Sequence, residues 1–394
     1  MKSYSLLVML SIALVLNSAC TTLVPRNPAP ITEGSSAQVP GIAKARFWGD
    51  DIPEHIERNL RTLSDAEIQR NFPAIYNRPH HYLALSGGGE NGAFGAGLLA
   101  GWAETGTRPE FQMVTGISTG ALIAPFAFLG SSYDHVLKKV YTTTSTKDII
   151  SLRNLVSILL TDAAADSGPL LRLIKRYVTD EVIEAIASEH RRGRRLFIGT
   201  TDIDRMRPRI WDIGAIASSG QPGNRELIHK ILLASASIPG AFPPVRINVE
   251  SDGKIYDELH VDGGTTSQVF VYPASLSWDR VLKRLRVPRP AKVFVIRNAL
   301  LMPDAEHVKQ RVLPIASRSI SSLIRTQGIG DLYLIYMLSR RDGIDYNLAY
   351  IPDDFDMESQ EIFDTKYMNK LYELGYYLGR KGYKWHKAPP GWVQ

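Results

Sequence analysis

Two polar residues flanked by glycines stand where strands are expected to end, and their side chains could together perform nucleophilic acyl transfer. Ser118 is the centre of Gly116-Ile117-Ser118-Thr119-Gly120, which has the spacing G-x-S-x-G. Flanking glycines in this pattern permit a sharp turn from strand to helix that exposes the serine hydroxyl. Asp262 ends a short strand-like run and is followed by Gly263 and Gly264. The pair offers a nucleophile and a carboxylate that could accept its proton.

A third feature is the glycine-rich run from Leu83 to Gly97, LALSGGGENGAFGAG. Gly87, Gly89 and Gly92 fall on the spacing G-x-G-x-x-G, which binds dinucleotides where it joins a strand to a helix. The same bare amides could instead donate hydrogen bonds to an oxyanion. A dinucleotide site also needs an acidic residue after the next strand, whereas Glu110 precedes that strand, and no Gly-Lys-Ser/Thr follows either glycine cluster. Local context leaves both interpretations open.

The segments around these residues alternate between short apolar runs and longer helical patterns. Strand length and β-branched or aromatic content mark the runs FQMVTGIS, RLFIGTTDI and KVFVIRN. Helical spacing marks Ala121 to Leu129, Leu170 to Ala187 and Glu226 to Ala234. The alternation predicts an α/β layered fold with a mostly parallel sheet. In such a sheet the carboxyl ends of nearby strands could bring Ser118 and Asp262 together.

The base that would activate Ser118 has two candidate types, a histidine or a carboxylate. The histidines that follow Ser118 are His135, His190, His229, His260, His307 and His386. An α/β-hydrolase would place its histidine after the serine and the acid, but none of these lies in a recognisable loop motif. Asp262 and a histidine such as His307 both stay open on this ground.

Four motifs occur in one order: GGGENG, GISTG, ASASIPGAFPPV and VDGG. Together they resemble the patatin-like phospholipase family, over roughly Tyr82 to Ala274. The resemblance implies a three-layer α/β/α fold with a mostly parallel central sheet and a serine acylhydrolase of lipids or phospholipids that uses a Ser-Asp dyad. It makes Ser118 the nucleophile and Asp262 the proton acceptor, with no cofactor and no metal. It makes Gly87 to Gly92 the oxyanion loop, with Gly87, Gly88 and Gly89 in the oxyanion hole. The other glycines of the motifs are Gly92, Gly116, Gly120, Gly263 and Gly264.

We expect amides of Gly88 and Gly89, with Thr119, to hold the oxyanion while Ser118 forms an acyl-enzyme. Asp262 would then activate the water that releases the fatty acid. An exposed aspartate has a pKa of about 3.9, so the mechanism needs partial burial to raise its basicity. Many members of the family carry Lys or Arg where this chain has Asn91, a departure that could weaken anion stabilisation.

The N-terminus predicts export. Lys2 precedes an unbroken run of apolar and small residues from Leu6 to Leu16, which is typical of a signal peptide over residues 1–19. Cys20 is the only cysteine in the chain, and LNSAC resembles a bacterial lipobox, although Asn17 stands where an apolar residue is usual. We expect lipidation of Cys20 and anchoring to a membrane. Cleavage after Ala19 and a periplasmic or secreted protein is the alternative.

Beyond Cys20 we expect three further parts, of which the family resemblance gives the catalytic domain. Residues 20–46, rich in Pro, Ser and Thr, are expected to form an extended tether. Residues 82–274 form the predicted catalytic domain, and residues 275–394 an extension packed on it that is largely helical from His307 to Met337 and again over the tail TKYMNKLYELGYYLGRKGYKW.

The formal net charge of +6 is small against 46 basic and 40 acidic residues, and mildly favours anionic partners such as phospholipid headgroups. No aromatic residues interleave with the basic cluster Arg191 to Arg195, which argues against nucleic acid. The alternatives to the dyad enzyme are an esterase with a histidine base, a nucleotide-binding protein that uses Gly87 to Gly92, and a catalytically silent lipoprotein that keeps the fold for binding.

Overall fold

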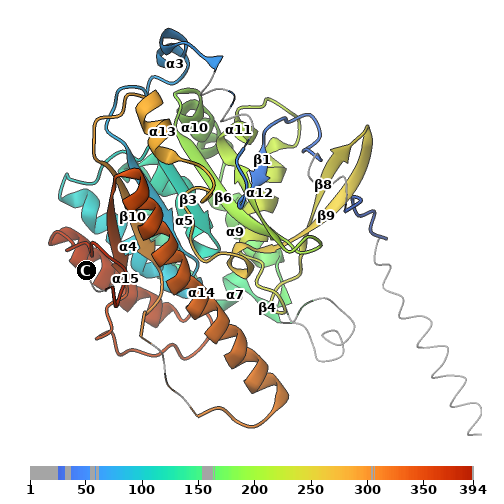
Figure 1. Ribbon diagram of the computed structural model, residues 1–394. Helices are drawn as coiled ribbons and strands as arrows, with labels where there is room; N and C mark the ends of the chain where they lie inside the picture. The colour runs from blue at the N-terminus through green and yellow to red at the C-terminus, as the bar shows by residue number, and fades with distance from the viewer. Residues whose placement is uncertain are drawn as a thin grey trace, which may run out of the picture.

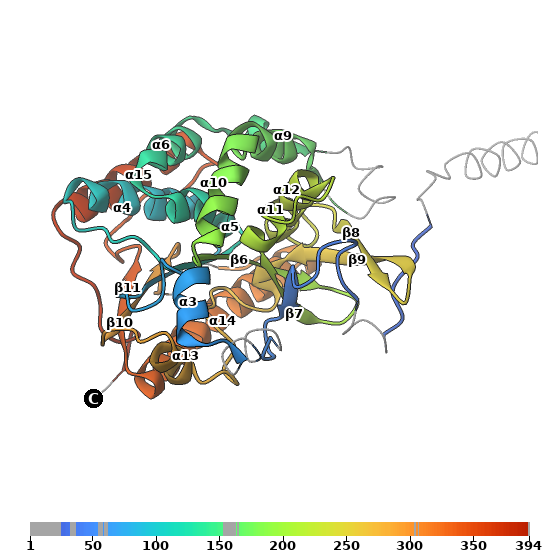
Figure 2. The same cartoon turned by 90° about the horizontal axis from the view of Figure 1, so that it is seen from above.

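The computed structural model describes residues 25–31, 37–53, 58, 62–152, 163, 165–302, 305 and 307–392. In this part of the chain a central sheet of nine strands lies between two layers of helices (Figure 1, Figure 2). The three-layer α/β/α arrangement expected from the sequence is confirmed.

Parallel strands form the middle of the sheet in the order β6-β3-β2-β10-β11. They are β2 (His81–Leu85), β3 (Met113–Ile117), β6 (Arg195–Asp202), β10 (Ala291–Arg297) and β11 (Ile344–Tyr350). The three apolar runs expected to be strands are thus β3, β6 and β10. Alternate residues of each strand point into the two hydrophobic cores on opposite faces of the sheet. Leu83 is buried in one core and Tyr82 in the other. Burial on both faces explains why these strands read as continuous apolar runs.

Antiparallel strands complete the sheet beside β6. The edge is formed by β7 (Arg207–Asp212) and β1 (Arg46–Trp48), and a hairpin by β8 (Val245–Ser251) and β9 (Lys254–Asp262). The end of β9 pairs with the end of β6. A separate two-stranded pair consists of β4 (Ser151–Leu152) and β5 (Ala165–Asp166).

Most helices cover one face of the sheet, as Figure 2 shows. They are α4 (Gly92–Glu104), α5 (Thr119–Leu129), α6 (Asp134–Thr143), α7 (Thr146–Ile149), α9 (Gly168–Tyr177), α10 (Asp180–Arg191), α11 (Ile213–Ala217), α12 (Asn224–Ser235) and α15 (Thr365–Arg380). The other face carries α3 (Asp65–Asn71), α13 (Trp278–Arg284) and α14 (Val312–Asp342). Short 3-10 turns occur at Gly89–Asn91, Ser131–Tyr133 and Gly263–Thr265.

One expected helix is divided. The pattern from Leu170 to Ala187 predicts a continuous helix, but α9 ends at Tyr177 and α10 starts at Asp180. Thr179 between them is extended, with φ −79° and ψ 176°, and serves as the N-cap residue of α10. Threonine followed by acidic residues favours a helix start, which outweighs the continuous apolar period.

The N-terminal segment differs from the expected tether where it is described. Arg26 donates through Nε to Asp257 at 2.8 Å, and Ala37 and Ala45 are buried. Its small residues and arginines therefore cover the β8–β9 hairpin and the edge strand. Cys20 and the expected signal peptide lie outside the described residues. No helix in the described part of the chain is long and apolar enough to cross a membrane.

The helices α4 and α15 pack at very close range because both carry glycines four residues apart. A Cβ on Gly375 would lie 2.3 Å from the carbonyl oxygen of Phe94, and one on Gly101 would lie 2.0 Å from that of Tyr376. Gly97 and Gly379 are equally tight. The C-terminal helix thus packs directly on the helix that follows the glycine-rich loop.

We predict that Gly375→Ala lowers the free energy of unfolding by about 1–3 kcal/mol, because the added methyl forces two backbones apart. The matched control is Gly330→Ala in α14, where a Cβ would meet nothing within 4 Å. Alanine favours a helix over glycine, so the control should gain about 0.5–1 kcal/mol. Urea unfolding of both variants measures the difference, and equal effects would contradict close packing of α4 on α15.

Candidate active site

Two strands of opposite direction meet end to end along β6. The parallel strand β3 ends at Ile117, which pairs with Gly199, and the antiparallel strand β9 ends at Asp262, which pairs with Thr200. Gly199 and Thr200 are consecutive and β7 fills the other side of β6, so the ends of β3 and β9 meet on the same edge of β6. The sheet therefore brings Ser118 and Asp262 together although 144 positions separate them (262 − 118 = 144).

Ser118 occupies a sharp turn at the start of α5. Its φ of 54° and ψ of −123° lie outside the regions that ordinary residues adopt, at a typical cost of about 1–3 kcal/mol. The flanking glycines are required, because a Cβ on Gly116 would lie 2.5 Å from the Gly120 carbonyl oxygen, and one on Gly120 would lie 2.3 Å from that of Leu85. This is the geometry that exposes a nucleophile above a sheet.

Two buried serines hold the nucleophile and the carboxylate in register. Ser235 Oγ accepts the Ser118 N–H at 3.0 Å and donates to the Gly199 carbonyl oxygen at 2.7 Å. The carbonyl oxygen of Ser237 accepts the Asp262 N–H at 2.9 Å. Both serines belong to the segment ASASIPGAFPPV, in which sequence reasoning gave them no role; the signal was a small-residue helix end that no turn chemistry explained.

Asp262 is buried, with 4% of its surface exposed. Its Oδ1 accepts the Gly264 N–H at 2.7 Å. The nearby Ser118 hydroxyl also lowers the pKa of Asp262. Its contact does not have the geometry of a hydrogen bond, so Asp262 Oδ2 has no hydrogen-bond partner among the described residues. Burial outweighs both contacts and raises the pKa of Asp262 to about 7. A carboxyl group of this pKa can exchange protons near neutral pH.

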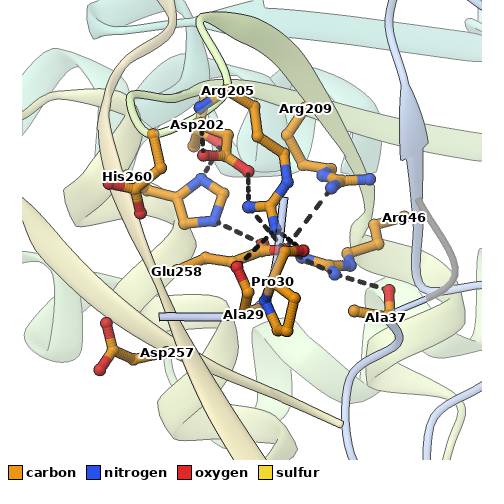
Figure 3. A network of polar contacts seen from close by, with 12 residues as sticks. Ala29, Pro30, Ala37, Arg46, Asp202, Arg205, Arg209, Asp257, Glu258 and His260 are labelled. Carbon is orange, nitrogen blue, oxygen red and sulfur yellow. Dashed lines mark hydrogen bonds and ion pairs between the residues drawn. The ribbon is translucent and has the colours of Figure 1, made fainter. Parts of the chain in front are cut away.

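The strand β9 is fixed by a buried polar network, shown in Figure 3. Residues 258, 260 and 262 share one face because side chains alternate along a strand. Glu258 forms an ion pair with Arg46, and Arg209 lies 3.6 Å from the same carboxylate. Burial alone would raise the pKa of Glu258, but the His260 hydrogen bond and the arginine charges hold it well below its usual range.

His260 links this network to the end of β6. Its Nε2 lies 3.2 Å from Glu258 Oε2 and its Nδ1 lies 3.0 Å from Thr200 Oγ1. Burial lowers the pKa of His260, so the ring is neutral. A neutral ring that donates to Glu258 must accept the hydroxyl proton of Thr200, so neither nitrogen is free to serve Ser118.

The glycine-rich loop lies against the nucleophile. A Cβ on Gly87 would lie 3.2 Å from Ser118 Cβ. We expect Gly87 among the oxyanion donors, but its N–H donates to the Gln268 carbonyl oxygen at 3.1 Å and is not available. Gly88 and Gly89 have φ of 156° and 57°. Within the described residues their N–H groups have no hydrogen-bond partner, which leaves them as the donors of the loop.

Gly88 cannot carry a side chain, because a Cβ would lie 2.0 Å from the Asn298 carbonyl oxygen. Gly92 is equally constrained, since a Cβ would lie 2.3 Å from Thr119 Oγ1. That hydroxyl is hydrogen bonded to the Tyr141 hydroxyl at 2.5 Å, so the side chain of Thr119 already has a partner. The backbone of Thr119 forms the first residue of α5. Backbone N–H groups in the first turn of a helix have no intrahelical partner.

The other end of the loop is held by the start of α15. Asn91 Oδ1 accepts the Tyr367 hydroxyl at 2.7 Å, and Glu90 Oε2 accepts the Asp364 N–H at 3.2 Å. The position where relatives often carry a cation therefore serves here as a hydrogen-bond acceptor.

A buried arginine on the opposite side of the loop was missed by sequence reasoning. Arg297 ends β10, is 4% exposed, and directs Nη1 toward the Gly87 carbonyl oxygen at 3.5 Å and Gln268 Oε1 at 3.4 Å. Burial lowers the pKa of Arg297 to about 10, so it remains a cation. Its signal was a basic residue that closes the apolar run KVFVIRN. Asp331 of α14 supports the same loop by accepting the Gln268 N–H at 2.6 Å.

The remaining candidates of the sequence analysis lie elsewhere. No hydrogen bond among the described residues joins Ser118 to a histidine: His229 bonds to the Val178 carbonyl oxygen, and His190 faces Asp212. Glu110 is half exposed and lies 3.9 Å from Arg194. In the same part of the chain no group of three or more His, Cys, Asp or Glu side chains is placed to hold a metal ion.

The raised pKa of Asp262 predicts a stability effect. Its folded pKa of about 7 exceeds the ordinary value, so its contribution to stability is full below about pH 4 and is lost as pH rises through 7. Asp262→Asn, which keeps an acceptor for Gly264, should therefore be more stable than wild type at pH 8, by up to about 4 kcal/mol, and similar at pH 4. Exposed Asp252→Asn is the control. Parallel unfolding curves of wild type and the Asp262 variant across this range would contradict the burial argument.

Comparison with known proteins gives one family match and one similar solved structure. Residues 83–275 match the family model described as patatin-like phospholipase. No curated protein gives a significant sequence match. Among solved structures the chain is similar to VipD from Legionella pneumophila, with 12% identity and a TM-score of 0.33 over 77% of this chain and 66% of VipD, less than two thirds of that protein. The match over residues 83–275 confirms the resemblance seen in the four motifs: this segment is similar to the patatin-like phospholipases, a family of lipid acyl hydrolases.

Proposed function

We propose that the protein hydrolyses acyl esters of lipids through a Ser118–Asp262 dyad and an oxyanion loop. One observation carries the proposal: a strained serine at the end of β3 faces a buried carboxyl group with a pKa of about 7 at the end of β9. Asp262 Oδ2 has no hydrogen-bond partner in the described part of the chain, so it is available to accept the Ser118 proton directly.

The reaction follows from these positions. Ser118 Oγ attacks the ester carbonyl carbon as its proton passes to Asp262. The N–H groups of Gly88, Gly89 and Thr119 donate to the oxyanion of the tetrahedral intermediate. The intermediate collapses to an acyl-serine, and the departing alcohol takes the proton from Asp262. Water then attacks the acyl carbonyl carbon, gives its proton to Asp262, and releases the fatty acid while Ser118 Oγ regains a proton.

Charge near the loop supports the oxyanion role despite Asn91. Arg297 lies behind Gly87 in a buried setting, where electrostatic interactions are stronger than in water. Its cation sits on the β10 side of the loop, whereas Asn91 and Tyr367 fix the α15 side. We infer that Arg297 supplies part of the positive potential that relatives obtain at the position of Asn91.

The N-terminal features extend the proposal to location. A signal peptide over residues 1–19 and lipidation of Cys20 would place the enzyme outside the cytoplasm on a membrane, with a role in lipid catabolism. Metabolic labelling with a palmitate analogue tests this, since Cys20→Ser should abolish incorporation. Labelling that persists in this variant would contradict lipidation at Cys20.

We predict that a fluorophosphonate probe labels Ser118 and that Ser118→Ala and Asp262→Asn each lower hydrolysis of a short soluble ester by at least about 10³-fold. His307→Ala and His135→Ala, both at exposed positions, are the controls that separate the dyad from a histidine base. The labelled residue is identified by peptide mass spectrometry. Full activity of Asp262→Asn, or loss of activity in His307→Ala without loss of folding, would contradict the dyad.

We also predict that kcat/KM rises with pH through about 7 and then levels, because Asp262 must be unprotonated to accept the serine proton. The profile is measured on the soluble ester in buffers of constant ionic strength. A rate that does not change between about pH 5 and pH 9 would contradict Asp262 as the base.

A further inference from the structure

The first half of α14 exposes large apolar side chains to solvent. Val312 is 82% exposed, Leu323 69%, Ile320 54% and Ile315 49%. In Figure 1 the amino-terminal turns of this helix extend beyond the body of the domain. Exposed apolar groups that are contiguous on one element mark an interaction surface.

These side chains form one stripe. Positions 312, 315, 320 and 323 follow the spacing of a single helical face. The second half of α14 behaves differently, because Leu332, Ile335 and Tyr336 are buried in the core. The helix therefore changes from a packed element to an exposed one near Gly328.

The exposed half is also basic. From His307 to Gly330 the sequence contains Lys309, Arg311, Arg318 and Arg325 and no acidic residue. Arg318 and Arg325 are seven residues apart and lie along one side of the helix, and Arg311 is the extended residue that precedes it. Lys309 and Arg311 are exposed, whereas Arg318 and Arg325 are half-buried, and Arg325 donates through Nη2 to the Leu301 carbonyl oxygen.

An exposed apolar stripe in a segment that contains four basic residues and no acidic one suits an anionic lipid surface. A second copy of the chain suits it less well, because antiparallel pairing of residues 312–330 of two such helices would bring arginines together, and neither segment contains an acidic residue. About 24 Å of helix is available from Val312 to Gln327 at 1.5 Å per residue, enough to lie flat across several headgroups.

We propose that residues 312–327 of α14 dock on a membrane that contains anionic phospholipids and thereby hold the Ser118 site beside its substrate. The docking is inferred from the exposed apolar stripe and the basic residues around it. The benefit of docking for catalysis rests on the proposed function.

The packed half of the helix connects this surface to the site. A Cβ on Gly328 would lie 2.6 Å from Arg297 Nη2, so the helix touches the arginine behind the glycine-rich loop. Three residues on, Asp331 accepts the Gln268 N–H, and the Gln268 carbonyl oxygen accepts the Gly87 N–H. The helix that carries the docking surface thus also contacts Arg297 and Gln268, two residues that contact the glycine-rich loop.

The test uses the full chain with Cys20→Ser, which removes the only cysteine and any acyl chain on it, so that a single new cysteine can carry an environment-sensitive fluorophore. With the label at Leu323→Cys, vesicles of phosphatidylcholine and phosphatidylglycerol should shift the emission to the blue, and vesicles of phosphatidylcholine alone should shift it less. The matched control is the label at Met206→Cys, which is 80% exposed in another region and should not respond.

Vesicle flotation then measures affinity without any hydrolysis. Ile320→Ser with Leu323→Ser should lower partition into the mixed vesicles by at least about tenfold, whereas Met206→Ser with Ile255→Ser should not change it. Thermal melting checks that both variants fold. Equal partition of the two double variants would overturn the proposal, as would a dimer that depends on Leu323 and does not bind vesicles. Neither result would bear on the activity of Ser118 toward a soluble ester.

Discussion

The site depends on the meeting of two strands on one neighbour. Because β3 and β9 pair with consecutive residues of β6 from opposite directions, the chain cannot place Ile117 and Asp262 in register without bringing Ser118 beside a carboxylate. Backbone hydrogen bonds of the ladder set this approach. The side chains that surround it, Ser235 and His260 among them, keep the two strand ends from shifting.

Distant parts of the chain reach the site through rigid elements. The N-terminal segment holds β9 through Arg46 and Glu258, and the C-terminal helix α15 holds the glycine-rich loop through Tyr367 and Asn91. Neither contact touches the dyad. Both fix the backbone from which a catalytic group projects, which is where displacements of about 1 Å affect rates most strongly.

Much of the fold could be predicted because its signals are local. Apolar runs indicated the strands, and G-x-S-x-G and VDGG indicated the ends of β3 and β9. The division at Thr179 was missed because a capping residue overrode an intact apolar period. Ser235, Ser237, Arg297 and Tyr367 act through contacts between segments far apart in sequence, so no spacing indicates them. Gly87 shows the same limit: its type predicts a donor, but its N–H bonds to the Gln268 carbonyl oxygen, a contact that only the fold creates.

The central claim is that Ser118 and Asp262 together cleave acyl esters of lipids. Lipid mass spectrometry of phospholipid vesicles incubated with wild type and with Ser118→Ala tests it most directly. The account predicts free fatty acid and the matching deacylated lipid from wild type alone, in equal amounts. Unchanged lipids with the folded wild-type protein, or the same products from Ser118→Ala, would contradict it.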